Sequence, residues 1–265
     1  MSENMLITNK QDGLFTIYFN RTDRLNALNG ELMDEFLYAC QKAEQDDSIR
    51  AVIVSGKGRA FCAGGDVRDG AKPRKGAPKP TDPRQAKIDL QEERTQAAYL
   101  LHTMAKPTIA VVRGAAMGAG MSIALACDYR IISETTVFSS AFVNNALSGD
   151  YGMAYFLANA IGIPKAMELI MLSKKLDAAA IDELGLATKL VADDELDATA
   201  LAFAQRLASG PTVAYAGIKS NLIASATTGL KDYLKVESEN QITCAYTQDI
   251  REAGKAFIEK RKPVF

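Results

Sequence analysis

The chain of 265 residues has few of the residues that build metal sites and disulfide frameworks. It contains one histidine, His102, which excludes a metal site built from several histidine ligands. Its four cysteines, Cys40, Cys62, Cys127 and Cys244, are widely spaced and include no CxxC pair. This spacing predicts reduced thiols in a cytoplasmic protein, with neither a disulfide framework nor a zinc site. We therefore expect no metal and no redox cofactor.

The charge balance and the lack of long apolar runs exclude further classes of protein. The formal net charge is −1, so nothing in it indicates binding to nucleic acid or to an acidic membrane surface. No apolar stretch approaches the roughly 20 residues needed to span a bilayer. Residues 1–5 lack the charged and apolar blocks of a signal peptide. Since 48% of the residues are apolar and 24% are charged, we expect a globular protein with one large core, or a core plus an appendage.

The first half of the chain alternates between predicted strands and helices. The predicted strands are short runs of apolar, β-branched or aromatic residues at 14–19, 51–54, 108–112 and 129–132. Asn29 is a predicted helix cap, because apolar residues follow it at helical spacing as far as Cys40. A second helix is predicted over 84–105, and Pro107 ends it. This order favours α/β units joined by right-handed crossovers.

The second half of the chain is mainly helical. Helical patterns cover 154–161, 165–172, 178–184, 196–208 and 212–224, and a last one ends near Pro263. Helices with apolar faces at the end of a chain often pack on a neighbouring subunit, so we predict an oligomer. The chain is accordingly divided into a core over 1–200 and a helical oligomerisation region over 201–265.

A basic, proline-rich loop is predicted between the two regular parts of the first half. Residues 71–83 contain four prolines together with Lys72, Arg74, Lys75 and Lys79. One interpretation is a solvated loop. The other is a lid whose lysines meet phosphate groups of a ligand, and the sequence leaves both open.

Two glycine-bearing segments carry the strongest functional signal. Residues 59–67 (RAFCAGGDV) and 114–121 (GAAMGAGM) each follow a predicted buried strand and lead into a segment that can open a helix. Small residues at such a turn leave backbone N–H groups bare and let a ligand approach the main chain closely. Two such turns can direct two donors at one oxygen. This arrangement stabilises a thioester carbonyl as it becomes an enolate.

These segments resemble the crotonase (enoyl-CoA hydratase/isomerase) superfamily, and the resemblance covers nearly the whole chain. Residues 61–66 resemble the first oxyanion segment of the family and 114–128 the second. Residues 24–28 are similar to its early loop, which touches the coenzyme A part of the substrate, and 257–261 fit its closing helix. The resemblance implies an α/β fold of repeated ββα units wound into a spiral. Its C-terminal helices would form a homotrimer or a dimer of trimers.

The resemblance also implies a substrate and roles for individual residues. The substrate is an acyl-CoA, so coenzyme A is part of the substrate and no separate cofactor is expected. The thioester oxygen would lie between the N–H groups of Gly65 and Ala119, where the dipole of the helix predicted over 121–126 also favours negative charge. The other residues expected to contact the substrate are Arg24, Asn26, Ala27, Ala63, Gly64, Asp66, Val67, Gly118, Phe142 and Lys260.

Some of these contacts have alternatives. For Arg24 and Lys260 the alternative is solvated surface charge, and Lys260 would otherwise meet coenzyme A phosphates, in its own or a neighbouring subunit's site. Asp66 also fits a structural role at the turn. Cys62 has no neighbouring histidine in sequence to activate it, so we interpret it as a small filler of the turn.

The sequence departs from the hydratases of the family at both catalytic glutamates. Ser122 and Phe142 occupy these positions, and neither exchanges a proton as a carboxylate does. Asp150 is the acid that remains, and it resembles the aspartate of the single-aspartate isomerases of the family. We predict an enoyl-CoA isomerase in which Asp150 moves a proton while the oxyanion hole holds the dienolate. An apolar wall including Phe138 and Phe142 would raise the pKa of Asp150 by desolvation.

Other functions stay open. Asp150 alone can act as a helix cap. In a hydratase or an acyl-CoA hydrolase, Asp150, alone or with Ser122, would position water. Because the catalytic glutamates are missing, a non-catalytic acyl-CoA-binding protein or an interaction subunit also stays open. A dehalogenase is disfavoured, because Thr95 occupies the place of the histidine it needs and His102 lies two helical turns away.

Overall fold

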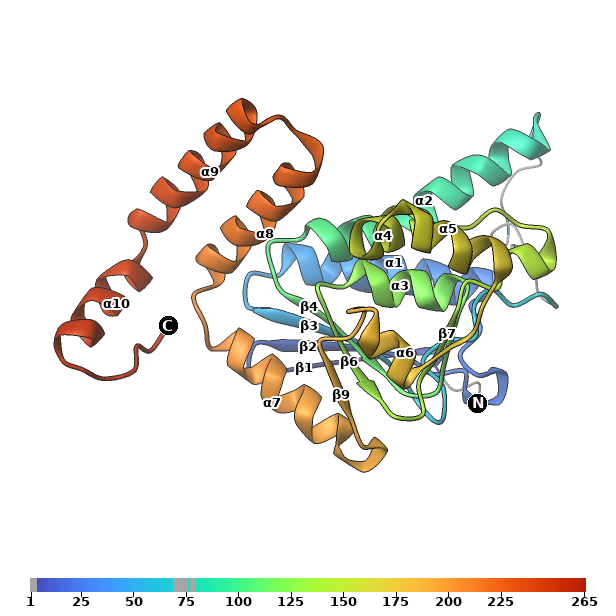
Figure 1. The fold of residues 1–265 in the computed structure, drawn as a ribbon, viewed down its shortest axis with the longest axis horizontal. Helices are drawn as coiled ribbons and strands as arrows, with labels where there is room; N and C mark the ends of the chain where they lie inside the picture. The colour runs from blue at the N-terminus through green and yellow to red at the C-terminus, as the bar shows by residue number, and fades with distance from the viewer. Residues whose placement is uncertain (1–3, 69–75, 77–79) are drawn as a thin grey trace.

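The computed structural model describes residues 4–68, 76 and 80–265, which fold around a mostly parallel sheet (Figure 1). Within this part of the chain the larger sheet has six strands in the order β1-β2-β3-β4-β6-β9. Their bounds are Leu6–Gln11 for β1, Leu14–Phe19 for β2, Ala51–Gly56 for β3, Thr108–Val112 for β4, Tyr129–Ser133 for β6 and Lys189–Val191 for β9. Only the pair β1 and β2 is antiparallel. All four strands predicted from the sequence are confirmed.

The central strands are buried on both faces, which explains why their sequences are apolar without alternation. In β3, Val52 and Val54 belong to the core under α1 (Gly30–Gln45), α2 (Pro83–Thr103) and α3 (Ala119–Ala126). Ala51 and Ile53 point the other way, into a second core formed with α7 (Leu196–Ala208). Figure 1 shows these helices on the two sides of the sheet.

The first helix begins where the sequence predicts. The Asn29 side chain accepts a hydrogen bond of 2.9 Å from the N–H of Leu32, which caps α1. Leu32, Phe36 and Cys40 follow at helical spacing and are fully buried. Residues 196–208, predicted as a helix, form α7 with the same bounds.

A smaller sheet lies beside the segments that carry the functional signal. It consists of β5 (Ala115–Met117), β7 (Val137–Ser139) and β8 (Leu176–Asp177). A β-bridge between Cys62 and Ala116 joins the first glycine segment to β5. Three helices, α4 (Met153–Ile161), α5 (Ile163–Leu172) and α6 (Ala178–Glu183), complete the body.

The last three helices form an arm that projects from the body (Figure 1). These are α8 (Thr212–Thr227), α9 (Leu230–Ala245) and α10 (Gln248–Ile258). The division placed at residue 200 falls inside α7, whose Leu196, Ala200 and Ala204 pack on the sheet. The arm therefore begins at α8, after the tight turn at Gly210.

Two further sequence predictions concern the basic loop and membrane-spanning segments. The basic loop predicted over 71–83 lies mostly outside the described residues. Among the residues that the structure describes, no helix combines the length and the apolar character required to cross a membrane.

Candidate active site

The early loop holds the first glycine turn in place through its backbone. The N–H of Leu28 donates to the carbonyl of Gly64 at 2.8 Å, and the N–H of Asp66 donates to the carbonyl of Leu28 at 2.8 Å. In this parallel bridge the N–H of Gly65 faces away from Leu28. No residue in the described part of the chain accepts a hydrogen bond from it. The turn therefore presents one bare backbone donor.

The second glycine turn packs directly against the first. The N–H of Met117 donates to the carbonyl of Cys62 at 2.9 Å. A Cβ on Gly64 would lie 2.8 Å from the carbonyl oxygen of Met117 and 3.8 Å from the nitrogen of Ala119. Ala119 is the first residue of α3, so its N–H has no partner within the helix. The structure thus brings together the two turns whose N–H groups the sequence predicts as oxyanion donors.

The close packing of the turns predicts a large cost for a side chain at Gly120. A Cβ there would lie 2.3 Å from the carbonyl oxygen of Cys62, so backbone would have to move. We expect Gly120→Ala to lower the free energy of unfolding by about 1–3 kcal/mol, measured by urea denaturation. The control is Gly254→Ala in α10, where a Cβ meets nothing within 4 Å and alanine favours the helix. Equal stabilities of the two variants would contradict this packing.

Asp150 lies on the segment that leads from β7 to α4. The N-cap of α4 is Gly152, and no side chain caps this helix, so the interpretation of Asp150 as a simple helix cap is wrong. The ring of Phe142 lies 3.7 Å from the Cβ position of Gly118 and 4.0 Å from that of Gly149. Phe142 therefore stands between the second oxyanion turn and the residue before Asp150.

Burial brings the pKa of Asp150 close to neutral pH. Desolvation raises the pKa of Asp150 to about 6, and a hydrogen bond from Gln91 of α2 acts in the opposite direction. Its Oδ1 atom is buried and has no hydrogen-bond partner among the described residues. The carboxyl group is thus ionised above about pH 6 and neutral below it.

Backbone strain is concentrated around Asp150. Ala141, Ala146 and Tyr151 adopt φ angles of +56°, +55° and +47°, the left-handed region that favours glycine. Each such residue costs on the order of 1 kcal/mol, and the surrounding structure must supply it. Residues 141–151 are therefore held in a conformation that their own sequence disfavours, a pattern typical of functional sites.

The whole chain matches one family of known proteins. Residues 9–265 match the model of the family described as enoyl-CoA hydratase/isomerase. The chain belongs to the enoyl-CoA hydratase/isomerase family. It is similar to the trans-2-decenoyl-[acyl-carrier-protein] isomerase of Streptococcus mutans, with 30% identity covering 98% of this chain and 97% of the relative. It is 32% identical to the 1,2-epoxyphenylacetyl-CoA isomerase of Escherichia coli, covering 98% and 97%.

Solved structures confirm the crotonase spiral. A putative enoyl-CoA hydratase from Streptomyces coelicolor superposes with a TM-score of 0.90 and 32% identity, covering 99% of this chain and 94% of that one. The names of the relatives include both isomerases and hydratases. Membership of the family thus identifies an enzyme that acts on CoA thioesters. It does not distinguish an isomerase from a hydratase.

Asn26 and Asp66, two of the residues predicted to contact the substrate, form hydrogen bonds with other residues of the chain. Asn26 is fully buried, and its amide nitrogen donates to the carbonyls of Lys57 and Ala60 at 2.9 and 2.7 Å. Asp66 accepts a hydrogen bond of 3.0 Å from Arg21, also in an ion pair. Both side chains therefore link the early loop to the first turn, a supporting role that agrees with the structural interpretation of Asp66.

The remaining contact residues of the early loop and first turn differ in their exposure to solvent. Gly65 and Val67 are exposed, Ala27 and Ala63 are half-buried, and Gly64 is buried. Arg24 is exposed, with its Nε atom 3.5 Å from Asp23. These positions leave an open rim beside Gly65, where a Cβ would meet nothing within 4 Å.

The structure does not bring Lys260 to the site of its own chain. Lys260 follows α10, which Figure 1 shows at the far end of the arm, away from α2, which carries Gln91, and from α4, which begins three residues after Asp150. A contact of Lys260 with coenzyme A phosphates therefore remains a proposal that involves a neighbouring subunit.

Three further residues have structural roles in this enzyme family member. Ser122 is fully buried and donates its hydroxyl to the carbonyl of Gly118 at 3.2 Å, so its hydrogen is engaged within α3. Burial raises the pKa of the Cys62 thiol to about 12, which leaves it neutral. His102 packs with ring centroids 5.9 Å from Tyr155 and 5.2 Å from Phe156, and burial lowers its pKa.

Sequence reasoning missed Gln91 and Arg21. Gln91 lies on a largely polar helix, and only the fold places it against Asp150. Arg21 contacts Asp66 and the carbonyl of Ala27, and it precedes the loop residues that the motif covers. Neither has a local sequence signal, because each acts across a contact between distant segments.

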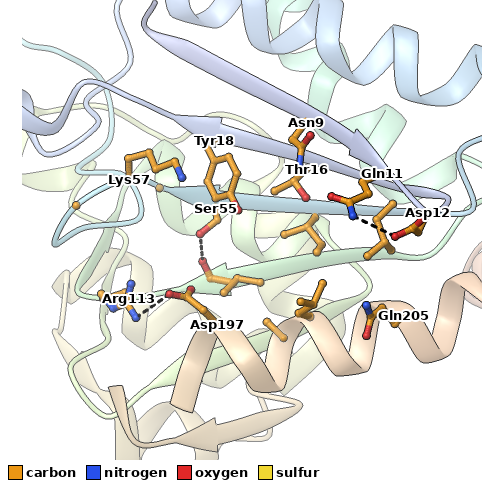
Figure 2. A pocket seen from close by; sticks show the side chains of 17 residues that line it. Asn9, Gln11, Asp12, Thr16, Tyr18, Ser55, Lys57, Arg113, Asp197 and Gln205 are labelled. Atoms are coloured by element: carbon orange, nitrogen blue, oxygen red, sulfur yellow. Dashed lines mark hydrogen bonds and ion pairs between the residues drawn. The ribbon is translucent and has the colours of Figure 1, made fainter. Parts of the chain in front are cut away.

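A groove of about 400 Å³ on the face of the larger sheet that α7 covers is separate from this site. Figure 2 shows it between β1–β3 and α7. Lys57 lies 3.7 Å above the ring of Tyr18, and Arg113 lies 3.5 Å from Asp197. Neither Asp150 nor the two oxyanion turns line this groove.

Proposed function

We propose that the protein is an enoyl-CoA isomerase that uses Asp150 as its acid and base. The observation that carries the proposal is a buried carboxyl group with a pKa of about 6, on a strained segment that Phe142 connects to the second oxyanion turn. Ser122 and Phe142 occupy the positions of the two catalytic glutamates of hydratases. The hydroxyl of Ser122 already donates a hydrogen bond to the carbonyl of Gly118. A single proton carrier suits a double-bond shift better than the addition of water.

In this proposal Asp150 first takes a proton from a carbon adjacent to the double bond of the acyl chain. The electron pair moves toward the thioester, and the N–H groups of Gly65 and Ala119 stabilise the oxygen of the dienolate. Since Ala119 begins α3, the helix dipole also favours this negative charge. The protonated Asp150 then returns the proton two carbons further along. Phe142 limits the access of water to the carboxyl group, and exchange of the Asp150 proton with solvent between the two steps brings deuterium into the product in deuterated water.

Mass spectrometry in deuterated water tests the proposal. A panel of enoyl thioesters, carried both by coenzyme A and by acyl carrier protein, is incubated with the enzyme. An isomerase leaves the mass unchanged apart from deuterium at the α or γ carbon. Products heavier by one water would identify a hydratase, and free coenzyme A a hydrolase. Thermal stabilisation by acyl-CoA without any turnover would indicate a binding protein and refute the proposal.

We also propose that the arm forms the contacts of a homotrimer or a dimer of trimers. Leu230, Tyr246 and Phe257 are 72%, 86% and 85% exposed, an unusual state for large apolar side chains. Light scattering coupled to size exclusion should give three or six times the chain mass of 28.6 kDa. Phe257→Asp should shift this mass toward the monomer, whereas Gln41→Asp on the exposed surface of α1 should not. A monomer in the wild-type protein would contradict the proposal.

A further inference from the structure

A group of buried polar atoms lies behind the carboxyl group of Asp150. Asp150 Oδ1, the hydroxyl of Tyr151 and Nη1 of Arg94 are all buried without a hydrogen-bond partner in the part of the chain that the structure describes. Tyr151 and Arg94 are each only 1% exposed. Buried polar groups in proteins nearly always have a partner, either another protein group or an ordered water molecule. Each of the three atoms therefore calls for a partner, and Tyr151, which is adjacent to Asp150 and experiences the charge of Arg94, lies next to both of the other residues.

Helix α2 places two of its residues opposite this segment. Gln91 and Arg94 are three residues apart, so they lie on the same face of the helix. Gln91 acts on Asp150, and the charge of Arg94 acts on Tyr151. The adjacent residues Asp150 and Tyr151 therefore face two adjacent positions on α2.

Two nitrogens of Arg94 bond to Asp34, and the third, Nη1, remains available to donate a hydrogen bond. Its Nε and Nη2 atoms donate to the two carboxylate oxygens of Asp34 in α1, at 2.8 and 3.2 Å. This two-pronged contact fixes the plane of the guanidinium group and leaves Nη1 as a buried donor. The charge of Arg94 is thereby balanced, and its third nitrogen can serve a neutral partner.

Tyr151 occupies its position at a cost in backbone strain. Its φ angle of +47° is in the left-handed region, where a residue with a large side chain is rarely found. The strained backbone directs the ring into the core, where its hydroxyl experiences the charges of Asp150 and Arg94. The other titratable groups that face it are the thiols of Cys62 and Cys40, and burial keeps both neutral.

We propose that Tyr151 is a positioning residue for Asp150, and that its hydroxyl and Arg94 Nη1 together hold one buried water molecule that donates a hydrogen bond to Asp150 Oδ1. This inference rests on the proposed function, in which Asp150 is the base. The water accepts hydrogen bonds from the hydroxyl and from Nη1, and so it has the three partners typical of buried water. With Oδ1 held in this way, Oδ2 is the oxygen left for the hydrogen bond from Gln91 and for the transferred proton. The donated hydrogen bond favours the ionised carboxylate.

The experiment compares Tyr151→Phe with Tyr155→Phe, a matched change on the nearby helix α4. The pKa of Asp150 is measured first in the ligand-free protein, by NMR titration of ¹³C-labelled aspartate. We expect Tyr151→Phe to raise this pKa by about one unit, because the ionised form loses a hydrogen bond, and Tyr155→Phe to leave it unchanged. Arg94→Lys keeps the positive charge but lacks Nη1, and it should shift the pKa in the same direction.

The pH dependence of turnover gives a second readout. If the pKa of Asp150 rises by one unit from about 6, the ionised fraction of Asp150 falls about fivefold at pH 6 and hardly at all at pH 8. Turnover by Tyr151→Phe should follow this profile. A loss of equal size at every pH, with an unchanged pKa of Asp150, would reduce Tyr151 to a packing residue and overturn the inference. A shifted pKa without any change in the pH profile would support the cluster and refute Asp150 as the base.

Discussion

Replacing Asp150 by asparagine is expected to reduce double-bond migration by roughly 100- to 10,000-fold. Asparagine has nearly the same shape as aspartate but cannot take up and return a proton at neutral pH. The two oxyanion turns lie on other segments, so binding of the acyl-CoA should persist. The rate is measured as deuterium uptake and as the amount of shifted isomer in deuterated water. In the wild-type protein it should rise with pH as Asp150 ionises around pH 6.

The same variant should be more stable than the wild-type protein at neutral pH. Burial raises the pKa of Asp150 from 3.8 to about 6, so the folded state holds its proton more tightly than the unfolded state. The wild-type protein therefore loses stability as the pH rises from about 4 to 6, and the full penalty applies above that range. By linkage the penalty is at most about 2–3 kcal/mol, and Asp150→Asn removes it.

The pairing of the two effects separates a catalytic role from damage to the fold. The control is Asp182→Asn, which changes an exposed aspartate of α6 in the same way. It should alter neither turnover nor the urea denaturation curve. Full activity in Asp150→Asn would refute the proposed mechanism. Low activity together with low stability would point to a structural role for the carboxylate.

The strands and helices that could be predicted are those whose own apolar pattern shows which of their faces are buried. The continuous apolar run of β3 requires burial on both faces, and the capped pattern from Asn29 allows only one helix. β1 was not predicted, because it is an edge strand with five exposed residues and a polar sequence. α9 was not predicted for a similar reason. It buries none of its residues within the chain, so no apolar face against the body marks it.

The same distinction applies to the candidate site, where residues in local motifs could be predicted and residues that depend on long-range packing could not. Asp150, Gly65 and Ala119 lie in local motifs whose turns depend on nearby residues, and these could be found in the sequence. Gln91 and Arg94 contact Asp150 and Tyr151 only when α2 packs against a segment about 60 residues away in the sequence. The side chain of Asn26 was expected at the ligand because its loop resembles a ligand loop. The fold turns that side chain inward, where it supports the first turn.

Replacing Ala119 by proline is expected to lower turnover by roughly 100- to 1,000-fold, the usual cost of one lost oxyanion donor. Ala119 is the first residue of α3, a position where proline fits the backbone and where the N–H has no partner within the helix. The change therefore removes the proposed donor while the helix can still form. Since negative charge on the oxygen develops during the reaction, kcat should fall far more than the affinity for a saturated acyl-CoA.

The added ring of proline is a second variable, because Ala119 is only 1% exposed. Ala119→Val adds similar bulk and keeps the N–H, so it measures the effect of crowding alone. If the N–H of Ala119 stabilises the enolate, proline must lower kcat much further than valine does. Equal losses in the two variants would show that crowding explains the effect, and the second donor would then have to be sought elsewhere.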